Sequence, residues 1–379
     1  MSNAGETWAR SGLLALTGWP DRPPVAGPAA VADGMARLAA DVARLGGPTL
    51  DGPALAGERA AIAGLGRQGR TSVGGACRLV RAAEGWLAVN LPRSSDLDLV
   101  PAWVGTTDWE AAVAERSVAE LDERAALLGL PVAIPGCVTG GPVVRRPRTP
   151  WTTRSRGSVR VVDLTSMWAG PLCASILGLA GADVVKVEDP RRPDGARLGP
   201  PAFYDLLHAG HRSVAVDLRS PAFVDLLRSA DVVLESSRPR ALEQLGIDRE
   251  AIAAETGCVW VAITARGLDG PDRNRPGFGD DAAVAGGLVA VDPDDGGPLF
   301  CADALADPVT GLTAAALALQ ALADGGAWIV DAGLAPCAAA LAGPAATVVG
   351  DAAPPRARRP IGVAAALGTH TDEVLARAG

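Results

Sequence analysis

The 379 residues are enough for two or three domains of ordinary size, and 48% of them are apolar although only 4% are aromatic. A core built from alanine, leucine and valine is therefore expected. The formal net charge of −8 argues against a nucleic-acid-binding surface, which needs an excess of basic side chains, but it allows a local arginine pocket.

The first predicted domain covers residues 1–150 and has the features of a smaller α+β domain. Helical periodicity marks residues 33–45 and 108–128, and residues 85–90 have the pattern of a strand. The stretch 143–156, VVRRPRTPWTTRSR, is basic and contains proline, so we expect it to be an exposed connection.

Part of this domain follows the same order of elements as a later part of the chain. Residues 11–18 lead through a proline-rich turn to Asp33 before a helix, and residues 287–291 lead through a turn to Asp307 before another helix. The shared order indicates a partial, degenerate repeat of the core, with chance similarity in an alanine-rich chain as the alternative.

The second predicted domain, residues 157–379, alternates strands with helices. The expected strands are 159–164, 182–188, 213–218, 231–235, 258–264 and 327–331. The expected helices are 171–179, 223–229, 248–256 and 311–323. This alternation predicts an α/β fold, a Rossmann-like parallel sheet flanked by helices.

The six cysteines lie far apart, no CxxC pair occurs and only three histidines are present, so the sequence predicts no metal site. Free, buried thiols indicate a reducing compartment, and we expect a cytoplasmic protein without an N-terminal signal segment. The uncharged stretch 332–350 is interrupted by Pro336 and Pro344, which favours a buried helix and loop over a membrane span.

The second domain resembles the family III CoA-transferases, also called the CaiB/BaiF family. Five segments carry the resemblance in the family's order: VVDLTSMWAGPLCASILGLAGADVVKVEDP (161–190), HRSVAVDLRSP (211–221), ADVVLESSRPRALEQLGID (230–248), VWVAITARGLDGPDRNRPGF (259–278) and ALADPVTGLTAAALALQAL (304–322). The closing LGTHTDEVLARAG (367–379) is similar to the family's C-terminal end. The small domain, which the family usually places late in the chain, corresponds here to residues 54–138.

The resemblance implies transfer of CoA between an acyl-CoA and a carboxylic acid, with CoA as substrate and no tightly bound cofactor. It also implies a homodimer or a related partner subunit, because active sites of this family lie at subunit contacts. Nothing in the sequence names the acyl group.

Asp307 has two interpretations. From its position before Pro308 and a helix, it could be a helix cap, a common structural use of aspartate. The resemblance instead implies the catalytic nucleophile, which would form a mixed anhydride with the acyl group and then an aspartyl-CoA thioester. Asp303 is a second candidate, expected from the sequence to be a solvated or turn residue.

Residues around the expected strand ends are candidates for binding CoA. Ligands of open α/β sheets bind where strands end, and the loop after the first strand holds Ser166, Met167, Trp168 and Ala169. Instead of binding CoA, this loop could be an ordinary turn between a strand and a helix. Trp168 could cover the pantetheine arm of CoA or only pack against other side chains. Four basic residues suit the phosphates of CoA, although each alone could be a solvated charge: Lys186, the only lysine, with Arg212, Arg219 and Arg238.

Two other functions are weighed against CoA transfer. Racemases of the same family use a histidine that corresponds to Phe278 here, and phenylalanine cannot transfer a proton. Gly279 replaces an acidic residue of many relatives, with Asp280 one position later, so a supporting carboxylate is shifted or missing. This departure and the rearranged layout keep a non-catalytic CoA-binding subunit as a third hypothesis.

Overall fold

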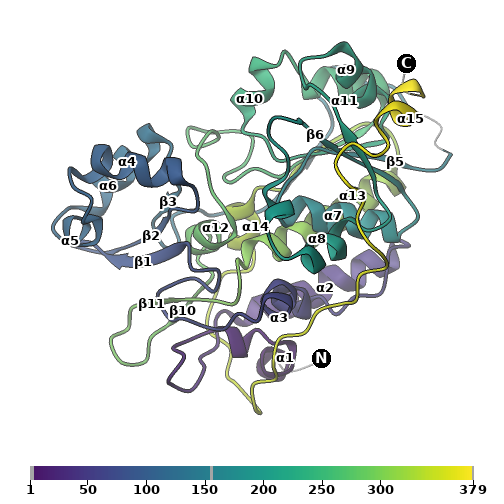
Figure 1. Ribbon diagram of the computed structural model, residues 1–379. Coiled ribbons are helices and arrows are strands. Elements are labelled where there is room, and N and C mark those ends of the chain that lie inside the picture. The colour runs from purple at the N-terminus through teal and green to yellow at the C-terminus, as the bar shows by residue number, and fades with distance from the viewer. Residues whose placement is uncertain (1–3, 154–156, 378–379) are drawn as a thin grey trace.

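A seven-stranded sheet forms the centre of the fold in the computed structural model, which describes residues 4–153 and 157–377 (Figure 1). Residues 154–156 of the expected connection and the last two residues of the chain lie outside the described residues. In sheet order the strands are β4 (Val143–Arg145), β12 (Trp328–Asp331), β9 (Val259–Ala262), β8 (Val232–Glu235), β5 (Arg160–Asp163), β6 (Asp183–Glu188) and β7 (Arg212–Ala215). From β12 to β7 all neighbours are parallel, which confirms the predicted sheet.

The edge strand β4 was not predicted. It pairs antiparallel with β12 and lies in the stretch that we expected to be an exposed connection. Val143 and Val144 remain partly open to solvent, as is usual at the edge of a sheet. Three residues without clear alternation are too few for a sequence pattern to mark a strand.

Helices cover both faces of the sheet and bury its valines in two separate cores. One core receives side chains from α7 (Ala169–Leu179), α8 (Pro201–His208), α12 (Gly279–Ala285), α13 (Ala306–Asp324) and α14 (Leu334–Ala339). The other receives them from α9 (Pro221–Ser229), α10 (Pro239–Gln244), α11 (Arg249–Thr256) and α15 (Thr371–Ala376).

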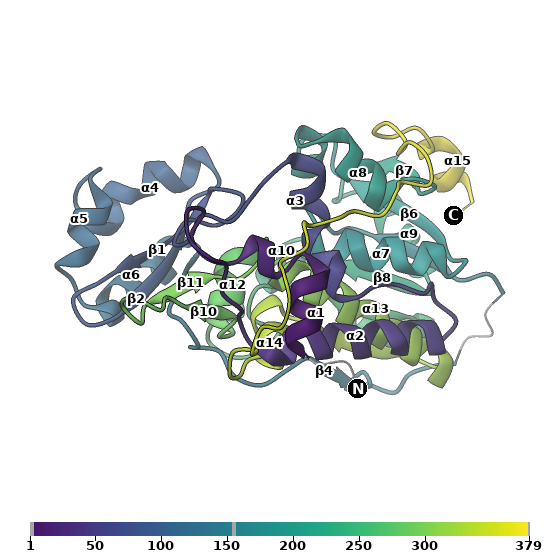
Figure 2. The ribbon, with the colours of Figure 1, turned by 90° about the horizontal axis from the view of Figure 1, so that it is seen from below.

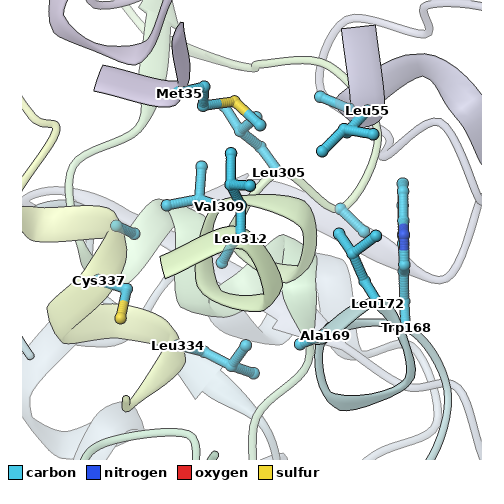
Figure 3. Close-up of a cluster of buried hydrophobic side chains, with 14 of the residues drawn as sticks. Met35, Leu55, Trp168, Ala169, Leu172, Leu305, Val309, Leu312, Leu334 and Cys337 are labelled. Carbon is cyan, nitrogen blue, oxygen red and sulfur yellow. The ribbon is translucent and has the colours of Figure 1, made fainter. Parts of the chain in front are cut away.

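The helix α13 lies at the middle of the first core. Figure 3 shows Val309 and Leu312 of α13 between Met35 on one side and Leu334 on the other. By length and composition alone α13 could cross a membrane, but most of it is buried inside this fold, as in the core helix of a globular domain. The expected helix and loop at 332–350 correspond to α14 and an irregular segment.

The beginning of the chain belongs to the same core. It forms α1 (Ala4–Ser11), η1 (Leu14–Leu16), α2 (Ala29–Arg44), η2 (Pro53–Gly57) and α3 (Glu58–Ala63). Trp8 and Met35 from these helices are fully buried in the cluster that also contains α7 and α13. The expected repeat pairs α2 with α13, and these two helices pack against each other.

A smaller α+β lobe stands beside the main body, as Figure 2 shows from below. It consists of β1 (Cys77–Arg81), β2 (Trp86–Asn90), β3 (Val132–Ala133), α4 (Ser94–Val104), α5 (Trp109–Ala114) and α6 (Val118–Leu128), with its own core around Trp103. The helix expected at 108–128 is two helices, because the Ser117 hydroxyl caps a new helix by accepting from the Glu120 amide. A hairpin of β10 (Val289–Val291) and β11 (Pro298–Phe300) lies next to β1.

Residues 340–370 cross the N-terminal helices before the chain ends beside β7 (Figure 2). Hydrogen bonds from Ala346 to Gly27 and from Ala353 to Ala9 attach this C-terminal segment. Arg358 pairs with the buried carboxylate of Glu58 at the start of α3, with Nε and Oε1 2.6 Å apart. The C-terminal segment therefore holds α1 and α3 against the main body.

Close packing between α7 and α13 depends on Gly311, where an added Cβ would lie 2.9 Å from the Leu172 side chain. We predict that Gly311→Val destabilises the protein by about 1–3 kcal/mol, because the helices must separate or adopt strained rotamers. Urea unfolding measures this change. The control is Gly66→Ala, where an added Cβ meets no atom within 4 Å. Equal effects of both substitutions would contradict the prediction.

Candidate active site

Asp307 lies in the first turn of α13, one turn before the Gly311 contact with α7. The helix begins at Ala306 after Leu305, and no side chain caps it. The interpretation of Asp307 as a helix cap is therefore wrong. Its carboxylate is partly exposed and accepts no hydrogen bond from any residue that the structure describes, so it is free to react.

The surroundings of Asp307 raise the pKa of its carboxyl group to about 7. Burial is the main cause, because it disfavours the charged form. The Arg59 guanidinium opposes this effect, whereas the carboxylates of Asp280 and Asp303 add to it. Near neutral pH, Asp307 therefore divides its population between a neutral acid and a charged carboxylate.

Asp303 lies in the turn before α13, as one of its two interpretations expected, but it is fully buried, so the expectation that it is solvated is wrong. Arg59 from α3 binds it with two parallel hydrogen bonds, one of them from Nε to Oδ2 at 2.8 Å. Bidentate contacts of this kind are the strong form of an arginine–carboxylate pair. The partner comes from 244 residues earlier in the chain, so no local pattern could indicate it.

Asp280 is the residue considered in the sequence as a shifted supporting carboxylate, and its charge acts on Asp307. It lies at the start of α12 and accepts a hydrogen bond from the Ala304 amide at 3.1 Å. Burial and the nearby Asp303 carboxylate raise the pKa of Asp280 to about 7, partly offset by Arg59. Asp281, the next residue, accepts from the Phe278 amide at 2.9 Å and from the Asn90 side chain at 2.7 Å.

The backbone around Asp307 has strained φ angles and leaves little free space. Ala302 and Ala304 have φ of +52° and +43°, in the left-handed region that alanine rarely adopts. At Gly279 any Cβ would overlap the Asp307 carboxylate and the Ala304 carbonyl. Glycine at position 279 therefore makes the space that the Asp307 carboxylate occupies.

The loop after β5 also approaches Asp307, and its residues change from exposed to buried along the chain. Ser166 and Met167 are exposed, and Met167 has a φ of +72°. Trp168 is only 2% exposed, packs edge-on against Phe203 and lies with its ring centroid 5.6 Å from the Arg59 guanidinium carbon. Of the two interpretations of Trp168, packing is the one that the structure supports.

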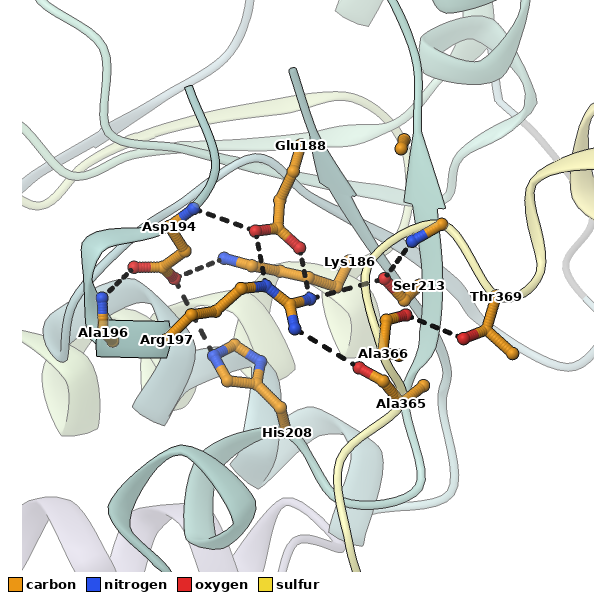
Figure 4. A network of polar contacts seen from close by, with 12 residues as sticks. Lys186, Glu188, Asp194, Ala196, Arg197, His208, Ser213, Ala365, Ala366 and Thr369 are labelled. Carbon is orange, nitrogen blue, oxygen red and sulfur yellow. Dashed lines mark hydrogen bonds and ion pairs between the residues drawn. The ribbon is translucent and has the colours of Figure 1, made fainter. Parts of the chain in front are cut away.

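Lys186 is buried, with 1% of its surface exposed, and does not face a ligand (Figure 4). Its ammonium group donates to the Thr165 carbonyl and to Asp194 Oδ2, the latter at 2.9 Å, and Asp163 Oδ2 lies 3.8 Å away. Burial alone lowers the pKa of Lys186, but the two carboxylates outweigh it and raise that pKa. The prediction that Lys186 binds a phosphate is therefore corrected.

This network holds the loop that follows β5. Asp194 accepts hydrogen bonds from the amides of Met167 and Ala196, at 3.0 and 2.9 Å. Lys186 thus fixes Thr165 directly and Met167 through Asp194. His208 lies 3.9 Å from Asp194, but burial lowers the pKa of its imidazole well below the usual value, so this approach is not an ion pair.

The three predicted arginines lie in different surroundings. Arg212 stands at the start of β7, away from the strand's carboxyl end, and is bound to Asp183 by hydrogen bonds that include Nε to Oδ1 at 3.0 Å. Arg212 is therefore committed to an internal ion pair. Arg219 is exposed in the turn after β7, close enough to Asp189 to influence its ionisation.

Arg238 belongs to a group of arginines that the sequence did not bring together. Burial lowers the pKa of Arg238, and the positive charges of Arg240, Arg93 and Arg192 lower it further. Among the described residues, Arg238, Arg240 and Arg192 have no ion-pair partner. Arg93 comes from the small lobe, so this repulsive arginine group, defined by these four residues, exists only in the folded chain.

Within residues 4–153 and 157–377, no group of histidine, cysteine, aspartate and glutamate side chains is placed to hold a metal ion. All six cysteines are free thiols, five of them buried.

A profile of CoA-transferase family III matches residues 157–369, more than half of the chain. The chain belongs to this family. A succinyl-CoA–D-citramalate CoA-transferase from Chloroflexus aurantiacus is 33% identical over 150 residues, covering 36% of this chain and 37% of that protein. The human succinyl-CoA:glutarate CoA-transferase is 32% identical over 169 residues, covering 41% and 39%. The chain thus spans less than half the length of these curated relatives.

Two solved structures match part of the chain. A hypothetical protein from Mycobacterium tuberculosis is 30% identical, with a TM-score of 0.45 and coverage of 51% of this chain and 57% of that one. A CAIB/BAIF family protein from Brucella suis is also 30% identical, with a TM-score of 0.43 and coverage of 48% and 53%.

We predict that Lys186→Met destabilises this family member by about 3–5 kcal/mol, because Asp163 and Asp194 are then left buried without a cation. Thermal and urea unfolding measure the loss. The control is Arg191→Gln, which removes an ion pair on the surface and is expected to change stability little. A Lys186→Met protein as stable as the wild type would show that the buried carboxylates need no partner.

Asp307→Asn is expected to stabilise the protein, by roughly 1–3 kcal/mol at pH 8 and less at pH 5. The folded-state pKa of Asp307, about 7, lies above that of an unfolded aspartate, so ionisation favours unfolding and stability falls as pH rises from about 4 to 7. Unfolding midpoints at both pH values test this. The exposed Asp225→Asn is the control, and an Asp307→Asn effect independent of pH would refute the prediction.

Proposed function

We propose that this chain transfers CoA from an acyl-CoA to a carboxylic acid, with Asp307 as the nucleophile. The observation that carries the proposal is the state of Asp307. It is a partly exposed carboxylate without a hydrogen-bond partner among the described residues, in a desolvated setting that raises its pKa to about 7. Such a group has the poor solvation and the accessibility that an attacking carboxylate needs. The relatives named as CoA-transferases support the same reaction class.

The proposed cycle has four steps. An Asp307 oxygen attacks the thioester carbonyl, the C–S bond breaks, and CoA thiolate leaves a mixed anhydride. The thiolate attacks the Asp307 carbonyl, releasing the donor acid and forming an aspartyl-CoA thioester. An acceptor carboxylate then attacks this thioester and expels the thiolate. The thiolate finally takes the acceptor acyl group, and the Asp307 carboxylate returns.

The exposed part of the loop after β5 is suited to the thioester end of CoA. Ser166 and Met167 present their side chains to solvent, and the Lys186 network fixes their backbone. Trp168 and Ala169 are buried, so they attach this loop to the hydrophobic core. A fixed loop lowers the entropic cost of aligning the thioester with Asp307.

The phosphates of CoA are proposed to bind the arginine group of Arg93, Arg192, Arg238 and Arg240, with Arg219 nearby. Burial and, after it, repulsion among these guanidinium groups lower the pKa of Arg238, and an anion placed between them would relieve that repulsion. Guanidinium groups also match phosphate geometry. Arg212 has no part in this proposal, because it is bound to Asp183.

Racemisation is the less favoured function. It needs a base beside the α-carbon, and Phe278 stands where the racemases of the family carry histidine. The chain has three histidines. Two are buried in the Lys186 region with lowered pKa values, His211 at about 4, and His370 accepts a hydrogen bond from the Ser213 amide. The two buried imidazoles are therefore kept neutral, and His370 is held by the strand β7.

A homodimer, or an assembly with a related subunit, is part of the proposal. Among the relatives, the succinyl-CoA–L-malate CoA-transferase of Chloroflexus aurantiacus has both an alpha and a beta subunit. Cytoplasmic location is proposed as well, on the ground that all six thiols are free.

Intact-protein mass spectrometry after incubation with a panel of acyl-CoAs tests the function. The expected result is a CoA adduct that hydroxylamine removes, present in the wild type and absent from Asp307→Ala. Peptide mapping should place it on Asp307. The Asp225→Ala protein, which lacks an exposed carboxylate, should form the adduct normally. A folded wild-type protein that binds CoA without any adduct would favour the non-catalytic CoA-binding subunit, and exchange of the α-hydrogen with deuterium would favour a racemase.

A further inference from the structure

Arg59 reaches the site from a part of the chain outside the segment that matches the family. It lies in α3, which the family profile does not cover. It binds Asp303 in the tight loop before α13, and its guanidinium lies over the ring of Trp168 in the loop after β5. Arg59 therefore touches both segments that flank Asp307.

Several charged groups face Asp307, and they come from three elements. Asp280 and Asp281 lie at the start of α12, Asp303 precedes α13, and Arg59 projects from α3. The three carboxylates oppose ionisation of Asp307, and Arg59 favours it. After burial, Arg59 has the largest influence on this group. The nearby Cys77 thiol is neutral, because burial raises its pKa well above the usual value.

We propose that Arg59 is a positioning residue for Asp307: it holds the Asp303 carboxylate in place and keeps Asp307 ionised for attack on the thioester. The mechanistic part of this inference rests on the proposed function. The N-terminal helices thus supply, within one chain, the cation that the family core by itself would lack at this acidic place.

The placement of Arg59 is well determined by the fold. Its neighbour Glu58 is 1% exposed and binds Arg358 of the C-terminal segment through Nε at 2.6 Å and Nη2 at 2.9 Å. α3 is therefore attached at both sides, by Glu58 to the C-terminal segment and by Arg59 to the loop before α13. Bidentate contacts leave the Arg59 guanidinium one orientation relative to Asp303.

The charge state of Asp307 can be measured without a substrate. A stabilised diazo reagent esterifies protonated carboxyl groups: the acid protonates the diazo carbon, dinitrogen leaves, and the carboxylate oxygen forms the new C–O bond. Peptide mass spectrometry then gives the fraction of esterified Asp307 at each pH. The midpoint of this curve reports the ionisation of Asp307, and in the wild type we expect it near pH 7.

Four variants separate positioning from a merely structural pair. Arg59→Gln should move the midpoint upward by roughly one pH unit, and Arg59→Lys, which keeps the charge, should restore most of the shift. Asp303→Asn should move it downward, because a negative neighbour is lost. The double variant Arg59→Gln/Asp303→Asn should lie between the two single variants.

The matched control is Arg358→Gln, which breaks the neighbouring buried pair on the same helix and leaves the charges around Asp307 intact. It should reduce stability without moving the midpoint. Equal midpoints in the wild type, Arg59→Gln and Asp303→Asn would overturn the proposal. If Arg59→Gln does not fold, the Asp303→Asn shift decides: a downward shift supports the charge coupling and an unchanged midpoint rejects it.

This readout is independent of CoA. Absence of a CoA adduct in the wild type would refute the proposed function, while the esterification midpoints would still test the coupling of Arg59 to Asp307. Where the adduct forms, its rate in Arg59→Gln should fall at least severalfold at pH 7 and recover at higher pH.

Discussion

The ion pair between Arg59 and Asp303 is the contact on which the arrangement of the site depends. It joins α3 to the loop before α13 and brings a positive charge to a place that already holds several carboxylates. Without that charge, burying Asp303 and Asp280 together would carry a large desolvation cost. The N-terminal helices are therefore part of the core fold and not an attachment to it.

A second buried network of ion pairs fixes the loop after β5. Lys186 is enclosed by Asp163 and Asp194, and it fixes Thr165 directly and Met167 through Asp194. Replacing buried ion pairs by apolar side chains is often neutral or favourable for stability, so their value here lies in geometry. Directed hydrogen bonds hold a loop in one conformation, whereas the apolar contacts of an alanine-rich core do not specify direction.

Predictions based on local patterns agree with the structure where one short segment decides the outcome. Valine-rich strands, the alternation with helices and the loop at Ser166 all follow from neighbouring residues. Asp307, expected just ahead of a helix, lies inside the first turn of α13. The predictions that Lys186 binds a ligand and that Asp303 is solvated were wrong for one reason. Their charge suggested contact with ligand or solvent, but the fold buries each of them against an oppositely charged partner, and burial with a partner reverses that expectation.

The amino-acid sequence by itself determined the parallel sheet and the ordered family segments, because periodicity and motif order are local properties of the chain. The candidate nucleophile came from the resemblance to the family. Only the tertiary structure decided which charges face one another. It brought Arg59 to the acidic loop, collected Arg93 with Arg238, and showed that Gly279 leaves room for the Asp307 carboxylate. These features depend on distances in space between separate segments of the chain, and electrostatic interactions are set by such distances and by burial, not by order along the chain.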